Sequence, residues 1–430
     1  MEGKKDKMIH THIAKVVTVA AVVVWGLPLG AATVCVNSSG QGGCQKTIGA
    51  AVAAASKGDT INIAAGTYKE TVTIGQTLAL IGTDPTKTII DATGLSNGII
   101  VDGIGNPGLN GVVISGLTVQ NANFEGILVT NSSNITIAGN VLTGNNKGLG
   151  FAGGMPVCPG IPSFETNEGF DCGEAIHLEG VQHSTVSNNS ITLNAGGILL
   201  SDDTGATHDN LIAGNSVINN PSDCGITLAS HVPAANAGST SPLGVYNNTV
   251  VGNTSSQNGL KGEGAGVGLF ASDVGTKVYG NIIVNNVLTG NDLPGIAVHG
   301  HTPQQNLDGN VFIGNKISGN GADTDDAFTP TTAGIMFLSV SPVSGTVFEQ
   351  NSIDTEGIGI AWNAPGEAKI QRNSFSGGIG IYNFGAGTVN GEGNWWGCPA
   401  GPIGPSLFVV GCSTSFGPVT FNSWAVAAPK

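Results

Sequence analysis

The amino-acid sequence predicts an all-β fold: a single-stranded, right-handed parallel β-helix with three short strands in each coil of about 22 residues. Two observations carry this prediction, a composition typical of turn-rich β-structure and a short unit that recurs along the chain. Of the 430 residues, 68 are Gly, whereas 10% are charged and 5% aromatic. This composition is too apolar for a disordered chain and lacks the strict triplet of collagen, while abundant Gly, Asn, Ser and Thr suit a β-structure with many turns.

The recurring unit contains an apolar strand, an Asn, a second short strand that ends in Asn or Gly, and a third strand that opens with Gly-Ile. The first two strands read ITIAGNVLTGN from residue 135, TVSNNSITLN from 185, LIAGNSVINN from 211, VYNNTVVGN from 245, VYGNIIVNN from 278 and FIGNKISGN from 312. The third strand reads GILL at 197, GITL at 225 and GIAV at 295, and the shortest spacings between third strands are 21, 22 and 23 residues. Strands this short must pair in parallel with the next coil to be stable.

The recurring Asn has a structural explanation. Asn tolerates the left-handed conformation of a tight turn, and its amide can bond the Asn one coil away. We therefore expect a single Asn ladder along the axis. Its expected members are Asn140, Asn189, Asn215, Asn248, Asn281, Asn315, Asn351 and Asn373.

Both ends of a solenoid need covers, because an open coil exposes an unpaired edge. Residues 47–56 (TIGAAVAAAS) have the pattern of a small amphipathic helix, which we expect to cap the first coil. Trp395, Trp396 and the Gly- and Pro-rich loop after them are expected to cover the last coil.

The seven Cys residues suit an oxidising compartment. Six of them fall into close pairs, for which we expect the disulfides Cys35–Cys44, Cys158–Cys172 and Cys398–Cys412. Cys224 is left over, and its place before a strand favours a buried small residue over a nucleophile.

Residues 1–32 have the pattern of an export signal: a basic stretch, an apolar run at 16–29 and small residues at 30–32. An uncleaved membrane anchor is the alternative, since the apolar run is near the short limit for a span. The expected organisation is a signal peptide (1–32) and one secreted, extracellular or periplasmic, β-helix domain (33–430). The domain is divided into an N-terminal cap (33–70), coils (71–390) and a C-terminal cap (391–430).

The net charge of −14 limits the partners. Residues 1–32 hold four Lys and two acidic residues, so the remaining chain carries −16. Nucleic acid is not an expected partner, because phosphate contacts need clustered Lys and Arg. A polyanionic sugar would also be repelled unless a cation such as Ca²⁺ bridged it to carboxylates, which makes Ca²⁺ a candidate cofactor.

The segment GDTINIAAGTYKETVTI at 58–74, the repeated coils and the closing NWWG at 394–397 resemble secreted right-handed β-helix proteins with pectate-lyase-type repeats, including NosD-like periplasmic repeats. The resemblance spans residues 35–425. It implies the fold and a polysaccharide partner, but the family includes lyases, epimerases, hydrolases and proteins without assigned activity. The Arg or Lys base and Ca²⁺-binding acidic cluster of the lyases have no clear match here. Of the hydrolases' NTD…DD…GHG…RIK series, only Asp202-Asp203 and Gly300-His301 are present as fragments.

The Gly-Ile strands predict one outward face with candidate functional residues. With Gly at position one, Ile at two and Leu at four point inward, and positions three, five and seven point outward. This register places four candidate catalytic residues on the face: Asp203, His231, His299 and His301. The candidate substrate-binding residues on or beside it are His177, Glu179, Asp202, Phe270 and Asp273.

Three interpretations of this face stay open. Its polar residues form an ordinary solvent-facing sheet, or they form a carbohydrate-active site, or they bind a metal such as Zn²⁺ or Cu²⁺. In the second interpretation Asp203 or Glu179 polarises or hydrogen-bonds, while a His acts as general base or acid near neutral pH. Binding or surface structure without catalysis is the alternative function. The acidic loop containing Asp323 is expected to be a solvated turn rather than a Ca²⁺ site.

Overall fold

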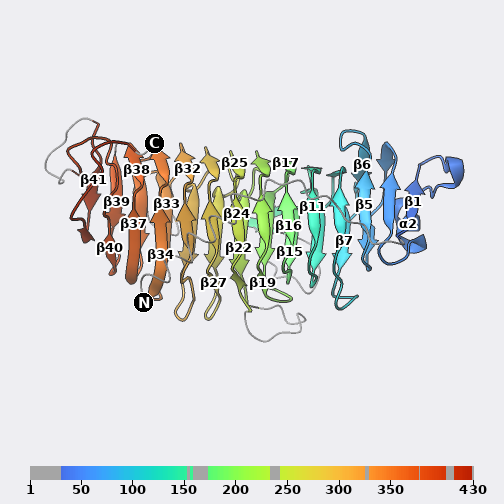
Figure 1. Cartoon of the computed structure of the whole chain (residues 1–430), viewed down its shortest axis with the longest axis horizontal. Coiled ribbons are helices and arrows are strands. Elements are labelled where there is room, and N and C mark those ends of the chain that lie inside the picture. Colours follow the sequence, from blue (N-terminus) through green and yellow to red (C-terminus); the bar gives the residue numbers. More distant parts are fainter. Residues whose placement is uncertain are drawn as a thin grey trace.

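The computed structural model describes residues 31–152, 155–157, 173–232, 243–324, 329–376, 378–402 and 411–428. These residues form an elongated right-handed β-helix in which three long parallel sheets run side by side along the axis (Figure 1). Residues 1–30 of the expected signal peptide and the expected Cys158–Cys172 disulfide lie outside the described residues. Within these ranges, no helix is long and apolar enough to cross a membrane.

Most coils contribute one short strand to each of three sheets, as the three-strand unit predicts. Among the described residues sheet A has fourteen strands: β1 (Thr33–Val36), β2 (Thr60–Ile63), β5 (Ala79–Gly82), β8 (Val113–Ser115), β11 (Thr136–Ala138), β16 (Thr185–Ser187), β20 (Leu211–Ala213), β24 (Thr249–Val251), β28 (Ile282–Val284), β31 (Val311–Ile313), β34 (Val343–Glu349), β37 (Gly366–Gln371), β40 (Thr388–Asn390) and β42 (Val419–Thr420).

In the same ranges sheet B has eleven strands: β3 (Gly66–Tyr68), β6 (Thr88–Asp91), β9 (Thr118–Gln120), β12 (Val141–Thr143), β17 (Ser190–Thr192), β21 (Ser216–Ile218), β25 (Thr254–Ser256), β29 (Val287–Thr289), β32 (Lys316–Ser318), β35 (Ser352–Asp354) and β38 (Ser374–Ser376).

Sheet C, made of the Gly-Ile strands, has twelve described strands: β4 (Val72–Ile74), β7 (Ile99–Asp102), β10 (Ile127–Thr130), β15 (Glu174–Glu179), β18 (Gly196–Ser201), β22 (Ile226–Ser230), β26 (Val267–Ala271), β30 (Ile296–Gly300), β33 (Ala333–Ser339), β36 (Ile358–Asn363), β39 (Ile379–Asn383) and β41 (Thr414–Phe416).

Two small sheets lie beside these three. Sheet D joins β19 (Thr207–His208), β23 (Val245–Tyr246) and β27 (Val278–Tyr279) in parallel, at the turn that connects sheet C to sheet A. A second small sheet pairs β13 (Gly150–Ala152) with β14 (Met155–Val157) in antiparallel orientation.

The interior is filled by aliphatic stacks, because the same inward position repeats in every coil. Ile176, Ile198 and Ile226 are direct neighbours in successive strands of sheet C and are at most 1% exposed. Larger side chains fill the C-terminal coils, where Phe337 stacks on Trp362 with ring centroids 4.7 Å apart. The inward register predicted from the Gly-Ile strands is therefore confirmed.

Among the described residues, Asn side chains form three ladders rather than the single ladder that the repeats predicted. The first ladder joins Asn140, Asn189, Asn215, Asn253, Asn286, Asn315, Asn351, Asn373 and Asn394. The second joins Asn145, Asn194, Asn220, Asn258, Asn291 and Asn320 and ends on Glu356. The third joins Asn210, Asn248, Asn281 and Asn310.

The assignment of Asn248 and Asn281 to the first ladder is thus wrong. The letters VYNN and VYGN resemble a sheet A strand followed by its Asn, but Val245–Tyr246 and Val278–Tyr279 belong to sheet D. Each of these two Asn residues therefore lies one turn earlier in its coil than the recurring unit predicted. In all three ladders the amide also bonds a backbone carbonyl, so these buried polar groups are satisfied.

The N-terminal cap is the helix α2 (Ile48–Ala54), seven residues long and therefore shorter than the ten expected. The Thr47 hydroxyl accepts a hydrogen bond from the Ala50 N–H, and the Glu70 carboxylate accepts from the Ile48 and Gly49 N–H groups, which satisfies the first turn. Ile48, Ala51 and Val52 bury the inner face.

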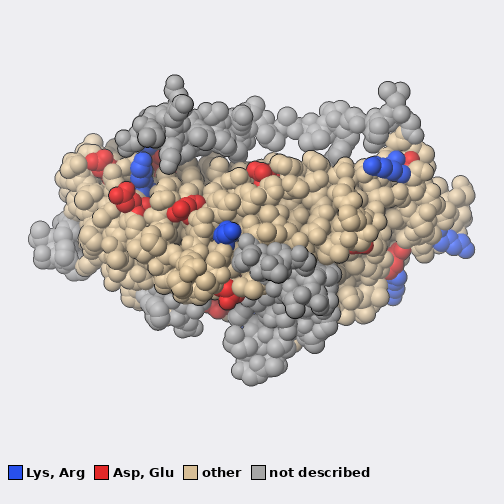
Figure 2. All heavy atoms as spheres, turned by 90° about the horizontal axis from the view of Figure 1, so that it is seen from below, with Lys and Arg blue, Asp and Glu red and all other residues tan. Residues whose placement is uncertain are grey.

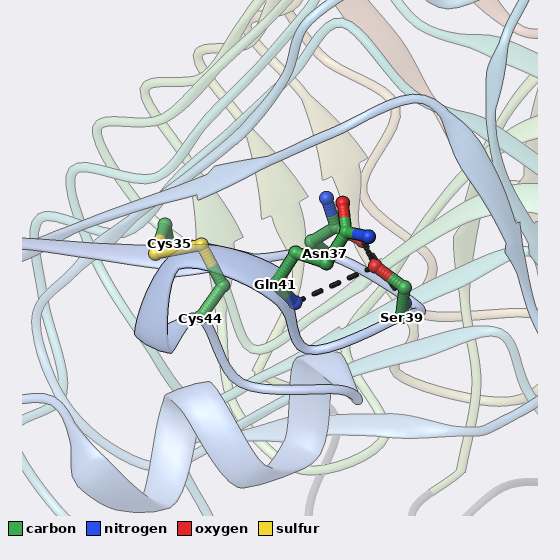
Figure 3. The surroundings of a disulfide bond; sticks show 5 residues. All are labelled: Cys35, Asn37, Ser39, Gln41 and Cys44. Carbon is green, nitrogen blue, oxygen red and sulfur yellow. Dashed lines mark hydrogen bonds between the residues drawn. A yellow bond between two sulfur atoms is a disulfide. The ribbon is translucent and has the colours of Figure 1, made fainter.

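The Cys35–Cys44 disulfide closes the loop before α2, which includes the 3₁₀ turn η1 (Gln41–Gly43) (Figure 3). Within this loop the Ser39 hydroxyl donates to the Asn37 side chain and accepts from the Gln41 N–H.

At the other end Trp396 is fully buried against Phe375, and the Cys398–Cys412 disulfide closes the loop that follows. Both caps and both of these disulfides agree with the sequence prediction.

Candidate functional site

Sheet C differs from sheets A and B in what covers its outer face. The middle strands of sheets A and B alternate between buried and partly exposed residues, as in β20 and β21, because their outward side chains meet solvent. In contrast, all residues of β15, β18, β22 and β30 are buried, including those that point outward. Outward polar residues on sheet C therefore lie in a desolvated environment.

This burial corrects one expectation. Positions five and seven were predicted to point outward to solvent. Asp203 and His231 at position seven are nevertheless each 2% exposed, and Glu179 at position five is fully buried. Met336, which occupies the outward third position of its strand, is fully buried in an apolar cluster with Leu338 and Ile358. The parity of these positions is as predicted, but parity gives the direction of a side chain and not what packs over it.

The pairing of strands brings the predicted residues into register. Glu179 on β15 lies beside Ser201 on β18, and Ser201 lies beside Ala229 on β22. The same row continues through Phe270 on β26 to His299 on β30. Adjacent coils are about 4.8 Å apart, so the row carries one side chain per step along the axis, and Glu179, Phe270 and His299 are its candidate residues.

Asp203 and His231 form the closest predicted pair, one coil apart at the ends of β18 and β22. The His231 Nδ1 lies 3.4 Å from the Asp203 Oδ2, and both side chains are 3% exposed. A carboxylate this close to an imidazole ring interacts with it electrostatically, and burial of both side chains strengthens that interaction.

Glu179 completes a group of titratable side chains around this pair. Burial raises the pKa of the Glu179 carboxyl well above its usual range, and the negative charge of Asp203 raises it further. The Thr204 side chain and His231 act in the opposite direction, and Glu125 adds to the increase. Glu179 is therefore a carboxyl group that stays protonated at pH values where an exposed Glu is ionised.

His177 lies on the same face and is held in the neutral form. Burial lowers its pKa from 6.5 to about 4, the charge of Asp203 opposes this change, and His231 reinforces it. Its Nε2 is 2.8 Å from the Ser201 hydroxyl, which lies one coil away. A neutral, hydrogen-bonded imidazole suits positioning rather than charge neutralisation.

Asp202 has a different environment from Asp203. Its carboxylate accepts hydrogen bonds from the Ser230 hydroxyl and from the His231 and Gly244 N–H groups, at 2.9, 2.9 and 2.6 Å. These bonds fix the backbone of His231, so Asp202 positions the residue that pairs with Asp203. Burial nevertheless raises the pKa of Asp202 above its ordinary value.

A second His–Asp pair lies two coils further along. His299 Nε2 is 2.6 Å from the Asp323 Oδ2, and Asp323 is fully buried. The expectation that Asp323 belongs to a solvated turn is therefore wrong. Phe270 packs on His299 with ring centroids 5.1 Å apart, and the exposed His301 meets His299 edge-on at 5.3 Å. Asp273, in contrast, is exposed.

Three buried carboxyl groups at the other end of these strands were not predicted from the sequence. Glu125, Glu174 and Asp223 are at most 6% exposed, although each precedes or opens a strand of sheet C. The signal that would have found them is an acidic residue at or just before the start of a third strand, which occurs at β10, β15 and β22 but not at β18 between them. Cys224, beside Asp223, is a buried free thiol as predicted, and burial raises its pKa well above the usual range.

Positive charge is lacking on sheet C. The twelve strands described above contain no Lys or Arg. In the view of Figure 2, Lys and Arg appear as isolated groups on a largely uncharged surface. The described strands thus supply carboxyl and imidazole groups but no ammonium or guanidinium group.

A family model for the right-handed β-helix region matches residues 87–319, which is more than half of the chain. The chain belongs to the right-handed β-helix family. Among curated proteins, none matches its sequence.

Solved structures of the same fold include GH136 lacto-N-biosidase from Eubacterium ramulus, with a TM-score of 0.57 and 12% identity over 85% of this chain and 67% of that one. A lidless DFA-IIIase from Arthrobacter chlorophenolicus A6 has a TM-score of 0.50 and 12% identity over 86% and 95% of the two chains. A protein of Geobacillus virus E2 has a TM-score of 0.49 and 15% identity over 83% of this β-helix protein, which spans 59% of the viral chain. At these identities the likeness concerns the fold.

Proposed function

We propose that this β-helix protein is a glycan-cleaving enzyme whose active site is the outer face of sheet C around Glu179, Asp203 and His231. The observation that carries the proposal is the pairing of Asp203 with His231 beside a buried Glu, all on adjacent coils. In this arrangement Glu179 donates a proton to the glycosidic oxygen. The Asp203–His231 pair accepts a proton from the attacking water.

The environments of the two carboxyl groups suit these opposite roles. Glycoside hydrolysis needs one carboxylic acid and one base on either side of the bond, and enzymes obtain them by separating the pKa values of two neighbouring groups. Burial and Asp203 hold the pKa of Glu179 high, which keeps the carboxyl protonated at pH values where an exposed Glu has lost its proton. Asp203 acts as the base together with the imidazole of His231, which lies 3.4 Å from its carboxylate.

The charge of the face favours a neutral glycan. Lyases and epimerases acting on uronates must stabilise negative charge that develops next to the sugar carboxylate, which requires cationic groups or metal ions. The described strands of sheet C contain carboxyl groups and no Lys or Arg. A uronate chain would be repelled there, whereas a neutral sugar is not.

Two further observations are compatible with this proposal. The lacto-N-biosidase and the DFA-IIIase, by their names enzymes, share the fold. The two disulfides of the caps suit an oxidising compartment, so we propose that the protein acts outside the cytoplasm. Glu179, Asp203 and His231 are nearly completely buried, so the proposal requires that a glycan gains access to them on binding.

The test is a screen of the purified protein on neutral and acidic polysaccharides, each with Ca²⁺ and with a chelator. Neutral chains are fructan, β-glucan and arabinan; acidic chains are alginate and polygalacturonate. We expect new reducing ends from a neutral chain. Glu179→Gln and His231→Ala should lower the rate by about 10²–10⁴-fold, the range for loss of a general acid or base, while substrate binding changes little.

Glu356→Gln is the matched control, because Glu356 is also a buried carboxyl with a pKa raised by burial. It lies at the end of the second Asn ladder, where a Gln oxygen can accept the same bonds from Asn320. Unsaturated products from an acidic chain would show that the enzyme is a lyase and not a hydrolase. Binding without any product would establish a non-catalytic carbohydrate-binding protein.

A further inference from the structure

The turn between sheets C and A carries a group of side chains outside the proposed active site. In this turn β19, β23 and β27 pair side by side (β19 and β27 are labelled in Figure 1), and one residue of each coil adopts the left-handed conformation. Asn134, His183, Asp209 and Asn247 occupy this position in four successive coils, with φ between 53° and 57°. Each donates its N–H to a carbonyl of the next coil, to Gln182, His208, Tyr246 and Tyr279 in turn.

The residue type at this left-handed position differs in two of the four coils. Asn is the ordinary choice for a left-handed turn, and it is present on either side. His183 and Asp209 replace it in two consecutive coils, so an imidazole and a carboxylate project from neighbouring rungs of the same ladder. Neither is needed for the turn itself.

A second imidazole completes the group. His208 Nδ1 is 2.7 Å from the Asp209 Oδ2, and its ring meets that of His183 edge-on with centroids 5.7 Å apart. One nitrogen of each His and one Asp209 oxygen all lie within 4.8 Å of one another. His183 and Asp209 are exposed, and the His208 side chain is 19% exposed, so the group is open to ions from solvent.

The His208 ring is held in place from the opposite side. It stacks on Tyr246 at a centroid distance of 4.8 Å and an interplanar angle of 4°, and Tyr246 stacks on Tyr279 at 4.9 Å. This stack along three coils restricts the rotation of His208. The His208 ring therefore loses less conformational entropy when it binds an ion.

We propose that His183, His208 and Asp209 form a binding site for a divalent transition-metal ion of the Zn²⁺ and Cu²⁺ class. Two imidazoles and one carboxylate are ligands that these ions prefer, whereas Ca²⁺ and Mg²⁺ prefer an all-oxygen shell. Metal–ligand bonds of about 2.0–2.1 Å place ligand atoms about 3 Å apart. The exposed His183 side chain must therefore move towards the other two by about 1–2 Å.

The ligands come from two consecutive coils, so the ion would link them. His183 lies in the turn after β15, whereas His208 and Asp209 lie between β18 and β20. Solvent occupies the remaining coordination positions. This site is independent of the glycan-cleaving proposal, because it uses none of the residues on the outer face of sheet C.

The test is calorimetric titration of ZnCl₂ into the full chain, prepared without a polyhistidine tag and freed of metal by a chelator. We expect one Zn²⁺ per chain and no competition by excess Ca²⁺. Three variants keep the local structure and remove one ligand each: His183→Asn restores the residue of the neighbouring rungs, His208→Phe keeps the ring stack, and Asp209→Asn keeps the turn. Each should weaken Zn²⁺ binding by about tenfold or more, at least the effect of losing an outer-shell partner.

Two controls make the result specific. Tyr246→Phe keeps the stack, and His301→Asn removes an exposed His from the face of sheet C, so both should bind Zn²⁺ as the parent protein does. Co²⁺ bound at the site should give visible d–d absorption that the His183→Asn protein lacks. Absence of saturable Zn²⁺ binding would overturn the proposal. If the three ligand variants bound Zn²⁺ with the affinity of the parent protein, the proposal would also be overturned. Loss of binding in His301→Asn alone would likewise overturn it and place the ion elsewhere.

Discussion

Replacing His177 with Leu should make the protein more resistant to acid. His177 is 2% exposed on the outer face of sheet C, between Leu128 and Leu199 of the neighbouring strands, so Leu is the residue that its row already contains. Burial lowers the pKa of His177 from 6.5 to about 4, with smaller effects of Asp203 and His231. The folded protein thus binds this proton more weakly than the unfolded chain does.

The sign and size of the effect follow from proton linkage. Because the folded-state pKa is depressed, the stability that depends on neutral His177 is present above pH 6.5 and is lost as the pH falls towards and through about 4. Each tenfold change in proton affinity is worth about 1.4 kcal/mol, so the loss approaches about 3 kcal/mol at low pH. Removal of the hydrogen bond to Ser201 costs about 1 kcal/mol, independently of pH.

The measurement is urea unfolding of the parent protein and the His177→Leu variant between pH 4 and pH 8, in the presence of a chelator. We expect the variant to be slightly less stable at pH 8 and more stable at pH 4, so that the two curves cross. Parallel curves for His177→Leu would refute the reasoning, because they would show that His177 titrates alike in both states.

Three further predictions concern the fold. Ile198→Ala should lower the free energy of unfolding by about 2–5 kcal/mol, since the side chain is 1% exposed in the interior stack; urea unfolding measures this, and a neutral result would contradict the inward register. Asn215→Ala should cost about 2 kcal/mol or more, because the Asn189 backbone and side-chain N–H groups lose their acceptor; slower amide exchange than in the parent at Asn189 would contradict this. Peptide mapping without reductant should find Cys398 joined to Cys412, and Cys224 should react with a thiol reagent only after unfolding.

The proposed metal site and the proposed active site occupy neighbouring parts of the same coils. Glu179 ends β15 and His183 follows four residues later, while Asp203 and His208 stand in a similar relation after β18. Their tests nevertheless separate them. Zn²⁺ binding depends on His183, His208 and Asp209, whereas glycan cleavage depends on Glu179 and His231.

The repeated sequence predicted the architecture because a β-helix places equivalent residues at equivalent positions in every coil. Inward Ile residues, the capping helix and the end disulfides were all readable, since each depends on local alternation or on short spacing. The Asn ladders show where such reasoning fails. Asn248 and Asn281 follow letters that resemble a sheet A strand, but the coil closes so that Val245–Tyr246 and Val278–Tyr279 enter sheet D instead.

The sequence by itself determined the direction of each side chain on sheet C, because the two-residue period of a strand fixes which face a residue occupies. Only the tertiary structure decided the environment of those side chains. The same outward parity gives an exposed His301 and a 2% exposed His231, and burial is what raises the pKa of Glu179 and lowers that of His177. Asp323 reaches His299 from a later loop of the chain, a contact that the winding of successive coils creates and that local sequence does not encode.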